Sequence, residues 1–130
     1  MPDTQLTAED LRGAFTKMAI DTAMGSDGIS AAELKLLPNG LLQRLVDLLC
    51  IIEKTGIWPD ALSTGLVTMI PKEEGDLRAA KLRPISVMST IYRGWAMARL
   101  PELLAWQETW ASSAICGCRP LFGCGDPILQ

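Results

Sequence analysis

Two cations near the middle of the chain stand directly beside prolines. Lys72 follows Pro71, and Arg83 precedes Pro84. Proline restricts its own backbone and the residue before it, so each proline ends or borders a regular element and holds its charged neighbour in one direction. A guanidinium grips phosphate oxygens as a fork, and an ammonium acts as a point charge. The pair predicts a site for a triphosphate or a nucleic-acid backbone, although a strand-capping arginine and an ordinary surface lysine fit the same residues.

Other chemistry is poorly represented among the side chains. The chain has no histidine, which excludes Ser-His-Asp and Cys-His catalysis, and the adjacent Glu73-Glu74 pair fits a solvated loop. Cys116, Cys118 and Cys124 lie close enough to suggest zinc, but a second pair of ligands is missing and Cys50 belongs to an apolar helical run. We expect free thiols, no metal site and no catalytic residue.

Composition and charge suit one ordinary globular domain. The chain has 130 residues and a net charge of −3, which by itself disfavours nucleic acid. The distribution is uneven: up to Pro71 there are five Lys or Arg against nine Asp or Glu, and from Lys72 onward there are seven against six. No apolar run is long enough to span a membrane, and the first residues do not resemble a signal peptide. We therefore expect an intracellular protein, cytoplasmic or nuclear, with no membrane partner.

Helices are predicted around the two cations. Thr7 and Asp10 form a capping box ahead of a helix over 8–20, and Ser30 with Glu33 repeats it for a short helix ending near residues 37–40. The glycine-rich segment 21–30 predicts a structural turn; it lacks the Gly-Lys-Ser/Thr ending of a phosphate-binding loop. A third helix over 40–54 has one apolar face and is closed by Gly56, beside which Trp58 should be buried.

The cations themselves fall on a predicted β-hairpin. Residues 66–70 are short, apolar and partly β-branched, residues 84–87 supply an antiparallel neighbour, and the charged segment 73–81 forms the tip. A long helix follows from Ser89 or Thr90 to Trp106 or Trp110, with a break or kink at Pro101. The sequence thus predicts an α+β fold that is mostly helical with a small antiparallel hairpin.

Several short segments together resemble a known family. They are Gly25-Ser26-Asp27-Gly28-Ile29-Ser30, Gly56-Ile57-Trp58-Pro59, Ile70-Pro71-Lys72, Leu82-Arg83-Pro84-Ile85-Ser86, Tyr92-Arg93, Ala98-Arg99-Leu100 and Gly117-Cys118-Arg119-Pro120. Their order and spacing resemble those of reverse transcriptases of non-LTR retroelements. The resemblance implies a truncated polymerase domain, with an N-terminal helix and linker over 1–24 and the fingers with the start of the palm over 25–130.

The resemblance also implies roles for particular cations. Lys72 and Arg83 would contact the triphosphate of the incoming nucleotide and the template, and Arg78 and Lys81 at the hairpin tip would make backbone contacts, unless they are simply solvated. Arg119 matches the arginine of the family's Gly-Phe-Arg-Pro-Gly segment. Cys118 stands where the family has an aromatic residue, and the residues after Pro120 also depart from the pattern.

The implied activity is RNA-directed DNA synthesis, with an RNA template, a DNA primer and the remainder of the polymerase domain as partners. The family holds magnesium on palm aspartates that this chain lacks, so we expect no cofactor in this chain and no polymerisation by it alone. The alternative is a non-catalytic helical protein-interaction module or a pseudogene product. The excess of acidic over basic residues supports this alternative.

Overall fold

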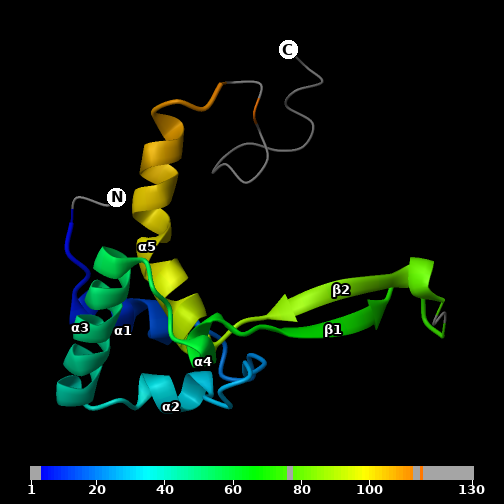
Figure 1. Cartoon of the computed structure of the whole chain (residues 1–130), viewed down its shortest axis with the longest axis horizontal. Coiled ribbons are helices and arrows are strands. Elements are labelled where there is room, and N and C mark those ends of the chain that lie inside the picture. Colours follow the sequence, from blue (N-terminus) through cyan, green and yellow to red (C-terminus); the bar gives the residue numbers. More distant parts are fainter. Residues whose placement is uncertain (1–3, 76–77, 113–114, 116–130) are drawn as a thin grey trace. The chain divides into compact units, whose positions relative to one another are not determined.

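The computed structural model describes residues 4–75, 78–112 and 115. The elements follow in the order α1 (Ala8–Lys17), α2 (Ala31–Lys35), α3 (Asn39–Thr55), α4 (Asp60–Ser63), β1 (Leu66–Pro71), the 3-10 turn η1 (Ala79–Lys81), β2 (Leu82–Val87) and α5 (Thr90–Glu108) (Figure 1). This is the mostly helical α+β fold with a small antiparallel sheet that the sequence predicts. Residues Thr4–Ala98 form one compact unit, and a second unit begins at Arg99. Among the described residues, no helix is long and apolar enough to cross a bilayer.

Both predicted capping boxes are present. The Thr7 hydroxyl accepts from the Asp10 amide at 3.2 Å while the Thr7 amide donates to the Asp10 carboxylate at 3.1 Å. Ser30 and Glu33 repeat the arrangement at the start of α2. These reciprocal bonds satisfy amide groups that the first turn of a helix leaves without partners. Helix α1 ends at Lys17, earlier than residue 20, because Met18 is already extended.

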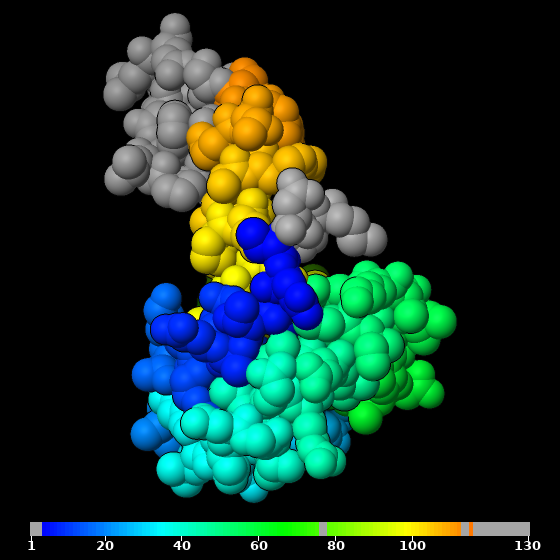
Figure 2. Space-filling model, turned by 90° about the vertical axis from the view of Figure 1, so that its left-hand side faces the viewer, coloured from blue at the N-terminus to red at the C-terminus, as the bar shows by residue number. Residues whose placement is uncertain are grey.

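The core forms where α3 meets α1, and Figure 2 shows these two helices side by side on one face of the molecule. The buried face of α3 consists of Leu42, Val46, Leu49, Cys50 and Ile52. Gly56 ends α3 in the left-handed conformation at φ 71°, and its amide donates to the Ile52 carbonyl at 2.7 Å. The predicted apolar face and its glycine stop are both confirmed.

Helix α5 approaches α1 so closely that one position must be glycine. A Cβ built on Gly94 would lie 2.2 Å from Cε1 of Phe15, whose side chain is fully buried. The side chain of Phe15 therefore occupies the space above the α5 backbone. Pro101 does not break α5, since the helix runs from Thr90 to Glu108 with Pro101 inside it. The alternative, a kink at Pro101, stays a prediction.

Trp58 lies beside the start of α5 in a cluster of three aromatic rings. Its ring centroid is 4.9 Å from that of Tyr92 and 4.9 Å from that of Trp95. The Trp95 indole donates to a carboxylate oxygen of Glu53 at 2.7 Å. Trp58 is half-buried and packs against the core, so the expected burial is reached in part.

The hairpin formed by β1 and β2 differs from the helices because none of its residues is buried. Its register pairs Leu66 with Val87 and Pro71 with Leu82. The two strands make up a two-stranded sheet, and the segment between them carries Gly75 at φ 80°. The strands and the charged tip are confirmed, with β2 starting at Leu82 rather than at residue 84.

Candidate functional site

The register of the hairpin places the two proline-bordered cations on one face. Arg83 lies opposite Ile70, and the Lys72 amide extends the ladder by donating to the Lys81 carbonyl at 2.8 Å. Side chains two residues apart on a strand share a face, and directly opposite residues do as well. Lys72 and Arg83 are therefore diagonal neighbours across the strands.

The cations differ in whether their charged groups already have hydrogen-bond or ion-pair partners within the protein. The Lys72 ammonium donates to the Ala80 carbonyl at 3.2 Å, and that of Lys81 pairs with Glu73 at 2.8 Å. The exposed guanidinium of Arg83 has no hydrogen bond or ion pair within the part of the chain that the structure describes. Arg83 is thus the cation most available to an incoming anion.

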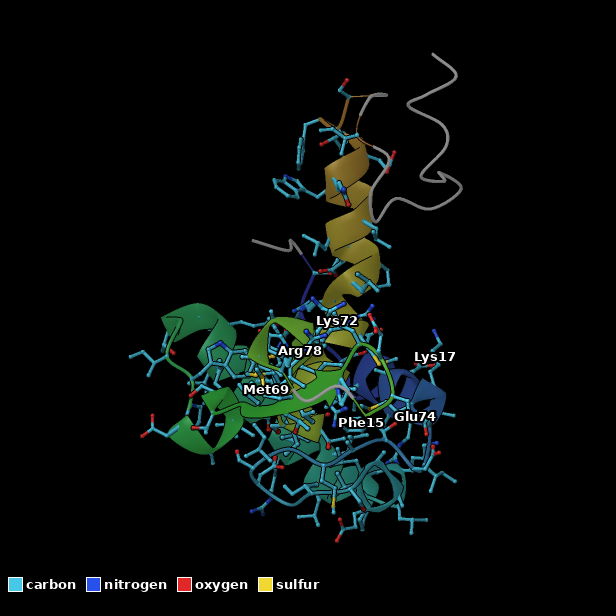
Figure 3. All side chains as sticks on the ribbon, turned by 90° about the vertical axis from the view of Figure 1, so that its right-hand side faces the viewer. Phe15, Lys17, Met69, Lys72, Glu74 and Arg78 are labelled. Carbon is cyan, nitrogen blue, oxygen red and sulfur yellow. The ribbon has the colours of Figure 1, made fainter. Side chains whose placement is uncertain are left out.

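The tip of the hairpin gathers further charge of both signs. Figure 3 looks along the hairpin and labels Lys72, Arg78 and Glu74 around this end. Arg78 and Glu74 are exposed, and Arg78 immediately precedes η1. An exposed mixture of this kind would bind phosphate in contact with solvent, so its affinity would depend strongly on salt.

The glycine-rich segment 21–30 is a structural turn whose polar groups are used within the protein. Gly28 has φ 69°, and a Cβ on Gly25 would lie 2.6 Å from the Ser89 Cα. The Ser89 hydroxyl donates to the Asp27 carboxylate at 2.6 Å, and the Thr90 hydroxyl donates to the Ile29 carbonyl at 2.7 Å. This turn therefore holds the start of α5, which follows β2 along the chain. It is a structural turn and not a phosphate-binding loop.

Two arginines have structural roles that the sequence did not reveal. The Arg12 guanidinium donates to the Leu37 carbonyl at 2.7 Å and to the Asn39 side chain at 2.8 Å, which joins α1 to the connection after α2 and to the first residue of α3. Arg93 on α5 donates to the Ala23 carbonyl. Arg93 also donates to the Thr90 hydroxyl at 3.1 Å. The contacts that join separate elements are not visible in the local sequence, because the Leu37 and Ala23 carbonyls lie more than twenty residues from the arginines that bind them.

The other residues that the sequence analysis singled out are Arg119 and the four cysteines. Arg119, Cys116, Cys118 and Cys124 lie outside the described residues. Cys50 is buried and free, as its place on α3 predicts. No group of three potential metal ligands occurs within the described ranges.

Comparison with known proteins relates the chain to a retroelement. No family model matches it. The chain is 27% identical, over 124 residues, to a retrovirus-related Pol polyprotein from the type-2 retrotransposable element R2DM of Drosophila melanogaster. The match covers 93% of this chain and 11% of the relative, so the chain spans about a tenth of the length of that polyprotein. This similarity supports a retroelement-related origin.

Proposed function

We propose that the chain is part of the fingers of a non-LTR reverse-transcriptase domain, in which the β1–β2 hairpin contacts the RNA template and the triphosphate of the incoming nucleotide. The similarity to a retrotransposon Pol polyprotein supports the origin. The observation that carries the function is the unoccupied guanidinium of Arg83 beside Lys72 on one face of an exposed hairpin.

The two cations would contact the triphosphate in different ways. Arg83 offers a planar fork that can hold two oxygens of one phosphate, whereas Lys72 adds a point charge that tolerates several positions of the next phosphate. Arg78 near the tip and Lys81 opposite Lys72 would meet the nucleic-acid backbone, without reading its sequence. Lys81 would first have to release Glu73.

In phosphoryl transfer a protein mainly positions the reactants and neutralises the charge that develops on the phosphate oxygens. Magnesium ions, which the resembled family holds on aspartates of the palm, would supply part of that neutralisation. The contribution of this chain is to orient the triphosphate through Arg83 and Lys72. Since neither residue is buried, this contribution is to binding and orientation rather than to proton transfer.

Binding of an RNA–DNA duplex by the full chain tests the proposal. Arg83→Ala and Lys72→Ala should each weaken binding and lower the slope of log K against log salt by about one. Arg44→Ala is the matched control, because Arg44 is an exposed cation on α3. A chain that does not bind the duplex, or in which all three variants behave alike, would contradict the proposal.

One observation favours a protein-interaction module as a second candidate. Helix α3 exposes Leu41, Leu48 and Ile51 by 54%, 41% and 57%, on the side away from its buried face. A helix that is apolar over most of its circumference usually has partners on more than one side. Absent or salt-insensitive duplex binding would favour this candidate, or a pseudogene product without a selected role.

A further inference from the structure

The two outer edges of the hairpin differ in what they offer to another strand. In an antiparallel pair, opposed residues alternate between those that bond each other and those whose backbone groups point outward. The Lys72 amide bonds to Lys81, so Ile70 and Thr68 on β1 also bond across to β2. Consequently Val67 and Met69 direct their amides and carbonyls away from β2.

The outer edge of β2 is blocked, whereas that of β1 is open. On β2 the outward positions are Leu82, Pro84 and Ser86. Pro84 has no amide hydrogen, and the Leu82 amide already donates to the Ala79 carbonyl, which leaves Ser86 alone with a free donor. On β1 the outward amides of Val67 and Met69 have no partner among the described residues.

The side chains of β1 also leave its edge open to another strand. Its sequence, Leu66 to Pro71, contains no charged residue. Val67 is 62% exposed, Met69 51%, and Leu66 47%. Proteins usually protect an edge strand with charge, proline or a covering element, and an open apolar edge attracts another strand. Here Pro71 protects only the end of β1 that lies next to the tip.

We propose that β1 pairs edge to edge with β1 of a second copy of this chain, antiparallel and centred on Thr68. In this register Val67 exchanges both backbone bonds with Met69 of the second copy, and the symmetric pair forms on the other side of Thr68. Leu66 then faces Ile70 across the interface, and no charges oppose each other. A second copy satisfies all the open groups because the edge is complementary to itself.

The blocked edge of β2 limits the assembly to a dimer. Pairing through β1 gives a four-stranded sheet whose two outer strands are both β2, and this edge has a proline at its centre. The contact is therefore closed by its two-fold axis and does not continue into a fibre. It also adds strands to a two-stranded hairpin, which by itself is marginally stable in water. This inference does not depend on the proposed function.

Sedimentation velocity over a dilution series of the full chain tests the inference. We expect a reversible monomer–dimer equilibrium. Val67→Lys places a charge on the open edge and should raise the dimer dissociation constant at least about tenfold. Ser86→Lys is the matched control, because Ser86 lies directly opposite Val67 and the two substitutions change the charge of the hairpin equally. It should leave the constant within about twofold.

A second pair of variants tests the backbone bonds themselves. Met69→Pro removes an outward amide without touching the β1–β2 ladder and should also weaken the dimer at least about tenfold. Ser86→Pro removes the corresponding amide of β2 and should have little effect. Far-UV circular dichroism checks that each variant keeps its helices.

Hydrogen exchange measures the same edge without any substitution. Exchange of the Val67 and Met69 amides should slow as the protein concentration rises, and exchange of the Ser86 amide should not. A monomer at all concentrations, or equal effects of the variants and their controls, would overturn the inference.

Discussion

The helices and the hairpin of the segment Thr4–Ala98 are built in opposite ways. The helices enclose Leu11, Phe15, Leu42 and Leu49, each at most 1% exposed. The hairpin contains no buried residue, and its apolar side chains face solvent. Burial of apolar area is the main source of folding free energy, so the helices should carry the stability of this unit.

The contrast also separates the roles of charged residues. In the helical part, the guanidinium of Arg12 bonds to backbone carbonyls and to Asn39, and these bonds hold separate elements together. On the hairpin, Arg83 makes no such bond among the described residues and is available to a ligand. Arginines of one chain can thus be tied into the fold or have no such bond, according to what surrounds them, which the residue type does not reveal.

The largest difference in stability between the core and the hairpin should appear when a buried aromatic ring is removed. Phe15→Ala deletes a fully buried aromatic side chain that packs at Gly94, and the free energy of unfolding should fall by about 3–5 kcal/mol. Ile85→Ala on β2, where the side chain is 44% exposed, should cost about 1 kcal/mol or less. Urea denaturation followed by circular dichroism measures both. Similar losses in the two variants would mean that the hairpin contributes to the stability of this unit as much as the core does.

A smaller effect is expected where the helices meet the hairpin. Ser89 is fully buried just after β2, and its hydroxyl donates to the Asp27 carboxylate at 2.6 Å. Ser89→Ala leaves that carboxylate without this donor and should lower the free energy of unfolding by about 1.5–3 kcal/mol, the range for hydrogen bonds to charged groups. Urea denaturation measures the change.

Ser63→Ala supplies the control for this bond. Its hydroxyl is exposed and reaches a carbonyl of its own helix at 3.4 Å, so its removal should cost little. If the two variants were equally stable, the anchoring of the turn 21–30 to α5 would not contribute to folding.

Local features of the fold could be predicted from the sequence, and long-range ones could not. The capping boxes at Thr7 and Ser30 and the stop at Gly56 depend on residues a few positions apart, so their patterns are visible in the chain. The hairpin joins neighbouring segments, and each strand is visible in its own short run of residues. The bond between Asp27 and Ser89 joins residues 62 positions apart and depends on how the helices pack. The helix through Pro101 shows the same limit, because proline disfavours a helix interior locally and the observed helix continues nevertheless.

For the candidate site, the sequence identified the cations but not their availability. The proline-bordered Lys72 and Arg83 were found from their neighbours alone. That Lys81 is paired with Glu73, and that Lys72 reaches Ala80, depends on the turn that the hairpin tip makes. The two edges of the hairpin could not be ranked either, because the outward direction of Val67 and Met69 follows from the register.

The smallest effect concerns the capping box of α2, and it depends on pH. The hydroxyl and the amide of Ser30 both donate to the Glu33 carboxylate, at 2.7 and 2.8 Å, and these bonds lower the pKa of Glu33 below its ordinary value of 4.5. Because the folded pKa lies below the unfolded one, the ionised carboxylate stabilises the fold above the unfolded pKa, and this contribution is lost as pH falls through the lowered pKa. Wild type should therefore be more stable than Glu33→Gln at neutral pH, and the difference should narrow as the pH drops below 4.5. Thermal unfolding at a series of pH values measures this difference in stability.

The same comparison in a Ser30→Ala background should show a weaker pH dependence, because the hydroxyl is the larger cause of the shift in the pKa of Glu33. A difference that stays constant down to strong acid would show that the stability of α2 does not depend on the ionisation of this carboxylate.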